Sequence, residues 1–298
     1  MAPSTPTDSG CDFPGPYDEF QTSIAGGNSY AAPVAGVLTS WSINEGPATG
    51  PVGLKVFRPQ GGSYLVVGHD GPRALTPNTL NTYAITIPVQ PGDLVGLSVP
   101  AASPSNCAFE TGQSGDVISY REGLAADGQS LSPEDSFTES RLNVSATLLP
   151  PPAITALTPA SGSIKGSTVV IAGANFAGVS GVAFGSVPAT GFTVNSEGQI
   201  TAVAPPSATL AAVPVVVTTI AGTATSAQPF TYEGCKVPQL NGKKLKAAKK
   251  KLRKANCKLG KLKKLHDATA KTGKVSKQNP EPGKLLAPGT KVKVVLDA

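Results

Sequence analysis

Residues 235–254 read CKVPQLNGKKLKAAKKKLRK, and this stretch contains the clearest secondary-structure signal of the chain. Four apolar residues recur at i, i+3, i+7 and i+10, the spacing of one face of an α-helix: Leu245, Ala248, Leu252 and Ala255. The pattern predicts a helix over about residues 242–256 with a narrow apolar stripe. Because lysines four residues apart repel each other, the packing of this stripe on a sheet must supply the stability of the helix.

Positive charge is concentrated around this helix. Residues 235–298 contain nineteen basic and three acidic residues, a formal charge of +16, whereas residues 1–234 contain six basic and sixteen acidic residues, a formal charge of −10. Eight of the twelve residues from 243 to 254 are basic and none is acidic. Such a run can be a merely solvated face, but its density also favours a polyanionic partner. The candidate anion-binding residues are Lys243, Lys246, Lys249, Lys250, Arg253 and Lys254.

The four cysteines fall into two pairs along the chain, Cys11 with Cys107 and Cys235 with Cys257. The sequence has no Cys-x-x-Cys pair and only two histidines, so we expect no metal site and no cofactor. Two disulfides predict an oxidising, extracytoplasmic compartment, and four free buried cysteines in a cytosolic protein are the alternative.

Neither end of the sequence nor its interior predicts a membrane anchor. No uninterrupted apolar run reaches membrane-spanning length, because prolines divide the best candidate, residues 200–221. The first residues lack the charged and apolar regions of a signal peptide, so the leader of an exported protein would not be part of this sequence.

Residues 11–149 alternate apolar and polar residues as half-buried strands do. The sets expected to face inward are Val37, Thr39, Trp41 and Ile43; Tyr83, Ile85, Ile87 and Val89; Val95, Leu97 and Val99; and Leu142, Val144, Ala146 and Leu148. About eight strands at this spacing predict an antiparallel, jelly-roll-like β-sandwich with an unknown ligand. Trp41 is in phase with its apolar neighbours, so we expect it in the core rather than on a sugar-stacking surface.

A proline linker at 150–152 leads to a second β-rich stretch, residues 153–232. Gly173 is expected to let the chain turn ahead of a buried Phe176, and Gly185 to permit a sharp turn. The pattern reads Ile154-x-x-Leu157-x-Pro159-x-x-Gly162, then Gly166-x-Thr168-Val169-x-Ile171-x-Gly173-x-Asn175-Phe176, then Val182-x-Phe184-Gly185, and ends in Phe230-x-Tyr232. This pattern resembles the IPT/TIG family, which implies an immunoglobulin-like sandwich. Since its only basic residue is Lys165, we expect a spacer rather than a phosphate-binding domain.

Residues 235–298 carry a further pattern around the basic helix. It reads Val237-Pro238-x-Leu240-x-Gly242, then Gly273-x-Val275-x-x-Gln278-x-Pro280-x-x-Gly283, then Gly289-x-x-Val292-x-Val294. This pattern resembles the PASTA domain, a small β-α-β-β unit of bacterial penicillin-binding proteins and membrane Ser/Thr kinases. The resemblance implies a partner in the bacterial cell wall, either peptidoglycan or the anionic polymers attached to it.

Two other polyanions compete with the cell wall as the partner. Residues 235–298 contain no Phe, Tyr or Trp, which removes base stacking, so we expect no specific nucleic-acid partner. An anionic membrane surface is disfavoured because the exposed helix face lacks bulky apolar residues that would insert into lipid.

The sequence shows no catalytic constellation. His69 and Asp70 lie in a Gly-His-Asp-Gly-Pro segment that predicts a turn, and His266 and Asp267 lie in a predicted loop. We therefore expect a mainly β, multidomain, non-enzymatic protein located outside the cell or in the cell wall, which docks through its basic module. The alternative is a carbohydrate-active enzyme or adhesin whose N-terminal sandwich carries the activity and whose basic module is only an anchor. The sequence does not indicate an oligomeric state.

Overall fold

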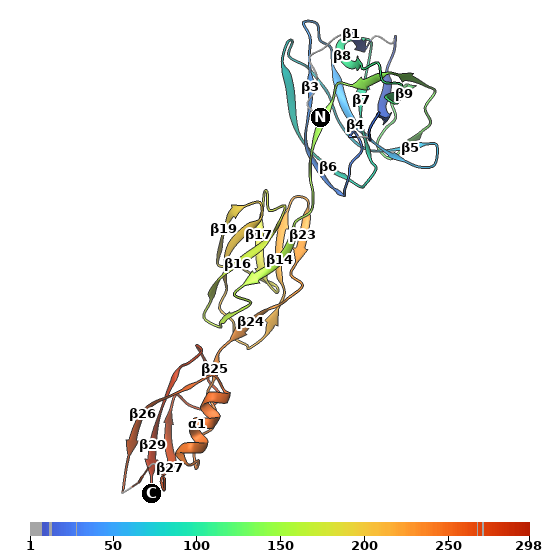
Figure 1. Ribbon diagram of the computed structural model, residues 1–298. Coiled ribbons are helices and arrows are strands. Elements are labelled where there is room, and N and C mark those ends of the chain that lie inside the picture. The colour runs from blue at the N-terminus through green and yellow to red at the C-terminus, as the bar shows by residue number, and fades with distance from the viewer. Residues whose placement is uncertain (1–7, 12–13, 28, 267, 270) are drawn as a thin grey trace. The chain divides into compact units, whose positions relative to one another are not determined.

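The computed structural model describes residues 8–11, 14–27, 29–266, 268–269 and 271–298. The described chain is mainly β and divides into two compact units, Met1–Pro151 and Pro152–Ala298. Figure 1 shows the strands of the first unit and, in the second unit, an all-β part followed by a part that contains the helix α1.

The first unit is built on a seven-stranded antiparallel sheet. Across this sheet the order is β10 (Ser130–Leu131), β5 (Tyr64–Arg73), β4 (Val52–Pro59), β7 (Leu94–Val99), β2 (Tyr17–Ser23), β9 (Val117–Glu122) and β11 (Asp135–Thr138). Two three-stranded sheets accompany it: β13 (Ser145–Leu149), β3 (Gly36–Asn44) and β6 (Leu80–Val89), and β1 (Asp8–Cys11), β8 (Ser103–Glu110) and β12 (Ser140–Leu142).

The main core of the first unit lies between the seven-stranded sheet and the β13–β3–β6 sheet. Trp41 of β3 is fully buried there with Leu54 of β4 and Leu97 of β7, which confirms Trp41 as a core residue. The expected inward-facing sets of β6, β7 and residues 142–148 all contribute to this core. The Cys11–Cys107 disulfide, also buried, joins β1 to β8.

The inward-facing set predicted for β3 is wrong at Thr39 and omits Leu38. The register of β3 on β6 shifts between Leu38 and Ser40, which is a β-bulge. An extra residue at a bulge reverses which side chains face the core. Leu38 therefore joins Trp41 in the main core, Val37 is buried outside this cluster, and Thr39 is only half-buried.

The turn predicted around His69 and Asp70 is also wrong, because residues 68–72 continue strand β5. Gly71 has φ 104°, a left-handed conformation that glycine adopts without steric cost. The chain is thereby bent within the strand, and the pairing of β5 with β4 reaches Arg73. Asp267, which follows His266 in the sequence, lies outside the described residues.

The other face of the seven-stranded sheet is covered in part by residues 123–129, here called the strap, which lead into the edge strand β10. Ala125 of the strap and Leu131 of β10 pack with Phe20 and Phe57 in a second, smaller apolar cluster. Both faces of β2 and β4 are consequently buried, which explains why these strands do not alternate between buried and exposed residues.

A buried ion pair attaches the strap to the sheet. Lys55 Nζ lies 2.6 Å from Asp18 Oδ1, and the two side chains are 4% and 0% exposed. The backbone of Ala125 completes the arrangement: its N–H donates to Asp18 Oδ2 at 2.9 Å, and its carbonyl accepts from Lys55 Nζ at 2.8 Å. The charges are therefore satisfied within the protein, as buried ions must be.

The all-β part of the second unit is an immunoglobulin-like sandwich. One sheet has the order β14 (Ala153–Thr158), β16 (Ser167–Ala174), β20 (Gln199–Ala204) and β19 (Gly191–Ser196), and the other β18 (Val187–Pro188), β17 (Gly181–Phe184), β22 (Val215–Thr219) and β23 (Gly222–Thr225). A small sheet contains β15 (Ser161–Ser163), β24 (Phe230–Glu233) and β21 (Ala212–Val213). Phe176 is buried as expected, but Gly173 lies inside β16 rather than at a turn. Glycine is needed at position 173 because a Cβ there would collide with the Phe176 ring.

The remaining part of the second unit is a small module in which one helix covers a sheet. The sheet has the order β26 (Lys258–Lys264), β29 (Lys291–Asp297) and β27 (Lys274–Asn279), with β26 parallel and β27 antiparallel to β29. A short pair, β25 (Cys235–Lys236) and β28 (Leu285–Leu286), accompanies it. Helix α1 (Leu245–Lys254), the one α-helix of the described residues, packs on one side of the sheet (Figure 1).

Candidate functional site

The predicted apolar stripe of α1 faces the sheet. Leu245, Ala248 and Leu252 are buried in a cluster with Val292 and Leu296 of β29. The fourth predicted member of the stripe, Ala255, is only partly buried and lies at the C-cap. Because repulsion between its lysines weakens the helix on its own, packing of this stripe against the sheet stabilises and orients it.

The helix is shorter than the predicted span of residues 242–256. Lys244 is its N-cap, with an extended backbone (φ −62°, ψ 151°) and, within the described part of the chain, no side-chain capping bond. At the other end Asn256 has φ 53°, a left-handed conformation that commonly terminates helices. The Cys235–Cys257 disulfide joins β25 to the residue just beyond this end, so the helix is held at its C-terminal side by a covalent bond.

The exposed side of α1 carries the candidate anion-binding residues. Five of them, which we call the helix basic face, recur at three- and four-residue spacings opposite the buried stripe: Lys246, Lys249, Lys250, Arg253 and Lys254. All five side chains are exposed, and no ion pair is present between them and any acidic residue of the described chain. The sixth candidate, Lys243, is exposed and precedes the N-cap.

The electrostatics of the helix basic face are those of an uncompensated cationic surface. The first turn of α1 contains no acidic residue, whereas Lys251, Arg253 and Lys254 in the last turn interact favourably with the negative end of the helix dipole. Elsewhere in the described part of the module, Glu281 pairs with Lys284 at 3.5 Å, and Asp297 pairs with His266 at 2.8 Å. The hydrogen bond from His266 lowers the pKa of Asp297 and so keeps that carboxylate ionised. Because Asp297 pairs with His266, it does not neutralise the basic residues of the helix.

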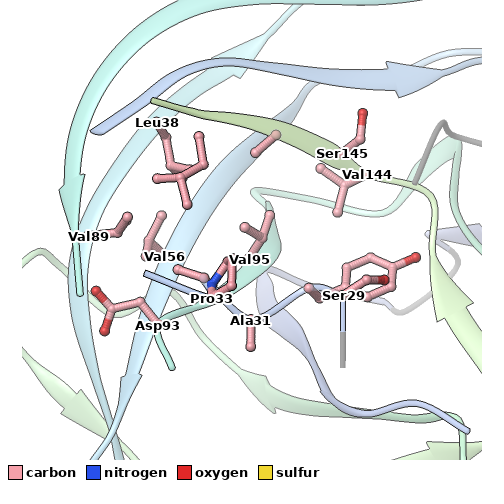
Figure 2. Close-up of a pocket in the computed structure, with 14 residues that line it drawn as sticks. Ser29, Ala31, Pro33, Leu38, Val56, Val89, Asp93, Val95, Val144 and Ser145 are labelled. Carbon is pink, nitrogen blue, oxygen red and sulfur yellow. The ribbon is translucent and has the colours of Figure 1, made fainter. Parts of the chain in front are cut away.

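An apolar pocket in the first unit was not predicted from the sequence. The side chains of Leu38, Val56, Val95 and Val144 surround it, and the Asp93 carboxylate lies at its edge (Figure 2). Its volume is about 90 Å³, well below the ~300 Å³ at which ligand sites for drug-sized molecules begin. Asp93 is held by a bidentate pair of hydrogen bonds from Arg58, each 2.8 Å long. The pocket is therefore too small for a glycan unit, and its one carboxylate is already paired.

A wider depression of about 470 Å³, lined in part by charged side chains, lies between the end of β5 and the strap. His69 Nδ1 lies 2.8 Å from Asp127 Oδ1 across it. Asp70 also lines the depression and accepts hydrogen bonds from Arg73 and from the Trp41 indole at 2.7 Å. The bond from Arg73, followed by the one from Trp41, lowers the pKa of Asp70. Both carboxylates are thus engaged in pairs within the protein.

Two other carboxyl groups have raised pKa values, but they lie in the protein interior. Burial raises the pKa of Glu19 to about 8 and, with partial compensation by the Asn106 N–H, that of Glu45 to about 7. These residues are 4% and 2% exposed, and neither lines a described pocket. No group of three or more His, Cys, Asp or Glu side chains that could hold a metal is found within the described part of the chain.

These features define a multidomain β-protein that ends in a small, strongly basic α/β module. Comparison with family models assigns its second unit: residues 152–232 form an IPT/TIG domain, and residues 236–298 form a PASTA domain. Both resemblances expected from the sequence are confirmed. No family model matches the N-terminal region.

Comparison with whole proteins adds little to the domain assignments. No curated protein matches the chain. One solved structure that it matches is SGBP-B from a complex xyloglucan utilization locus in Bacteroides uniformis, with 18% identity and a TM-score of 0.25. The match covers 53% of this chain and 39% of that one. A TM-score this low does not establish a shared fold or function.

The described residues include no helix of the length and apolar character needed to cross a membrane. The PASTA domain and the two disulfides are consistent with a location outside the cell or in the cell wall.

Proposed function

We propose that this protein is a non-catalytic, cell-wall-associated protein that binds an anionic wall polymer through the helix basic face of its PASTA domain. Domains of this family bind peptidoglycan-type ligands. The observation that carries the proposal is the set of five exposed basic side chains on one side of α1, none of which has an acidic partner in the described chain. A surface of this kind attracts a polymer of phosphates or carboxylates by charge alone.

The chemistry of the module supports an electrostatic mode of binding over a stacking mode. Residues 235–298 contain no aromatic side chain other than the imidazole of His266, so sugar rings and nucleobases find no stacking surface. Binding by ammonium and guanidinium groups is instead sensitive to salt, because each contact releases a condensed counterion from the polymer.

The carboxyl groups of the first unit support a non-catalytic role. Glycoside hydrolysis needs a protonated carboxylic acid and a second carboxylate that face the same cleft. In the depression beside the strap, Asp70 is paired with Arg73 and its pKa is lowered, which is unfavourable for a general acid. The carboxyls with raised pKa values, Glu19 and Glu45, are buried away from it. These observations disfavour the alternative of a carbohydrate-active enzyme.

The test is binding of the full-length protein to purified cell walls in a salt series. Raising the salt from about 0.05 M to about 0.5 M shortens the screening length from about 14 Å to about 4 Å, so the fraction bound should fall steeply. A helix variant with Lys246→Gln, Lys249→Gln, Lys250→Gln and Lys254→Gln should bind more weakly. The slope of log affinity against log salt should decrease by about 3 in magnitude, at roughly 0.7 per lost contact.

The matched control replaces the same four lysines with arginine, which preserves charge and helix propensity. It should retain wild-type binding, and so should Lys165→Gln, which removes an exposed charge from the IPT/TIG domain. Retention that does not depend on salt, or equal binding by the helix variant and the wild type, would refute the proposal.

A further inference from the structure

The sheet of the PASTA domain carries a second basic surface on the side away from α1. Along β29, Val292, Val294 and Leu296 are buried beneath the helix, whereas Lys291 and Lys293 alternate with them and are exposed. The neighbouring strands add Lys258 and Lys263 of β26 and Lys277 of β27, all of them exposed. We call these five lysines the sheet basic face: Lys258, Lys263, Lys277, Lys291 and Lys293.

The strand register places these lysines next to one another. Lys258 pairs directly with Lys291 across the β26–β29 ladder. Lys263 and Lys277 are both register partners of Val295, one from each side, and Lys293 lies two residues before it on the same face. Adjacent strands are about 4.8 Å apart, and residues i and i+2 of a strand about 6.7 Å apart, so the five Cα positions form a compact group.

The positive charges of this group are not neutralised within the described residues. The two described acidic residues of the module, Glu281 and Asp297, pair with Lys284 and His266. Like charges that face each other across a sheet destabilise it, so the direct neighbours Lys258 and Lys291 oppose folding in the absence of an anion. An arrangement that costs stability in the free protein is explained if an anion occupies this face.

The two basic faces lie on opposite sides of one apolar core. Leu245 and Leu252 of α1 and Val292 and Val294 of β29 fill the space between them. A polymer chain on the helix basic face cannot reach the sheet basic face without passing round the edge of the module. Each face is therefore available to a separate chain.

We propose that the PASTA domain binds two anionic polymer chains at once, one on each basic face, and thereby cross-links the polymer. This inference rests on the proposed function, since it assigns a second binding surface to the same domain. The ligand chemistry is a linear polymer with phosphate or carboxylate groups, and the protein would act as a bridge between chains as well as a bound component.

The experiment uses inorganic polyphosphate as the probe and the full-length protein. A short chain that cannot pass round the module reports the number of sites by titration calorimetry, and a long chain reports cross-linking by light scattering. A sheet variant carries Lys258→Gln, Lys263→Gln, Lys277→Gln and Lys293→Gln, and the helix variant defined above removes the same number of charges. Circular dichroism verifies that both variants are folded.

The wild type should bind two short chains and produce strong scattering with the long chain. Each variant should bind one short chain and lose the scattering, and their combination should lose binding altogether. Without probe, at low salt, the sheet variant should have a higher Tm than the wild type, because it removes the Lys258–Lys291 repulsion.

Three results would overturn the inference, and they differ in what they imply for the proposed function. If the sheet variant keeps the stoichiometry and scattering of the wild type, the second surface does not exist and the helix site stands. If the sheet variant alone loses all binding, there is one site and it is not the helix. If the wild type binds neither probe, both proposals fail.

Discussion

Glu19 lies on β2 between Leu97 of β7 and Tyr120 of β9, and its replacement by glutamine should stabilise the first unit at neutral and alkaline pH. The side chain is 4% exposed, and its Oε1 has no hydrogen-bond partner among the residues that the structure describes. Burial raises the pKa from its ordinary value of 4.5 to about 8. The folded protein thus keeps the carboxyl protonated over a pH range in which the unfolded chain releases the proton.

The sign and size of the effect follow from proton linkage. Above pH 4.5 the unfolded state binds fewer protons than the folded state, so the free energy of unfolding decreases as pH rises and levels off near pH 8. One group contributes a slope of about 1.4 kcal/mol per pH unit, which amounts to something on the order of 5 kcal/mol over the whole window. Glu45 adds a similar slope up to about pH 7, the pKa to which its burial raises it.

Glu19→Gln resembles the protonated acid in shape and cannot ionise. Below pH 7 we expect the variant to show roughly half the pH slope of the wild type, because Glu45 still titrates. From pH 7 to 8 its stability should be flat while that of the wild type continues to decrease. At pH 8 the variant should be the more stable by several kcal/mol.

The assay is urea denaturation followed by the fluorescence of Trp41, the single tryptophan of the chain and a fully buried residue of the first unit. Glu110→Gln, at an exposed position on β8, is the control and should retain the wild-type slope. Wild-type stability that is equal at pH 5 and pH 8, or parallel slopes for wild type and Glu19→Gln, would refute the reasoning.

Three further predictions concern stability. Lys55→Ala leaves the Asp18 carboxylate buried without its partner and should lower the unfolding free energy of the first unit by about 3–5 kcal/mol, measured by urea denaturation. An unchanged unfolding free energy would contradict the burial of the pair. Cys235→Ala with Cys257→Ala opens a loop of sequence separation 22 and should lower the unfolding free energy of the PASTA domain by about 3 kcal/mol, measured by far-ultraviolet circular dichroism. As a control, a reductant should lower the unfolding free energy of this domain by the same amount in the wild type and should not change it in the variant. Gly173→Ala places a Cβ against the Ala153 carbonyl and the Phe176 ring and should destabilise the IPT/TIG domain by roughly 1–3 kcal/mol in calorimetry. The control Gly181→Ala should be nearly neutral, because the added Cβ has no atom of the described residues within 4 Å.

The features that could be predicted from the sequence are those encoded within short stretches. The stripe of Leu245, Ala248 and Leu252 follows from helical periodicity alone, and the structure buries all three. The two disulfides are not local, but their pairing follows from the grouping of the four cysteines, two in residues 11–149 and two in residues 235–298. The IPT/TIG and PASTA domains follow from glycine and apolar residues at fixed spacing.

The features that could not be predicted depend on register between distant strands. The bulge in β3 places Leu38 in the core and leaves Thr39 half-buried, and nothing in a local alternation pattern reveals an extra residue. The sheet basic face requires Lys258 to lie beside Lys291, a pairing over more than thirty residues of sequence. A weak signal did exist for the ion pair under the strap, because Lys55 is the one charged residue inside the apolar run of residues 52–57.

The way in which the strap is attached has a consequence for how the first unit tolerates mutation. Ala125 meets Asp18 and Lys55 through its N–H and carbonyl, groups that every residue except proline presents in full. Substitution of Ala125 is thus limited by side-chain size and by the exclusion of proline, whereas Asp18 and Lys55 can be replaced only together. In a saturation library, position 125 should accept other small residues but not proline, whereas viable single substitutions at 18 and 55 should be scarce.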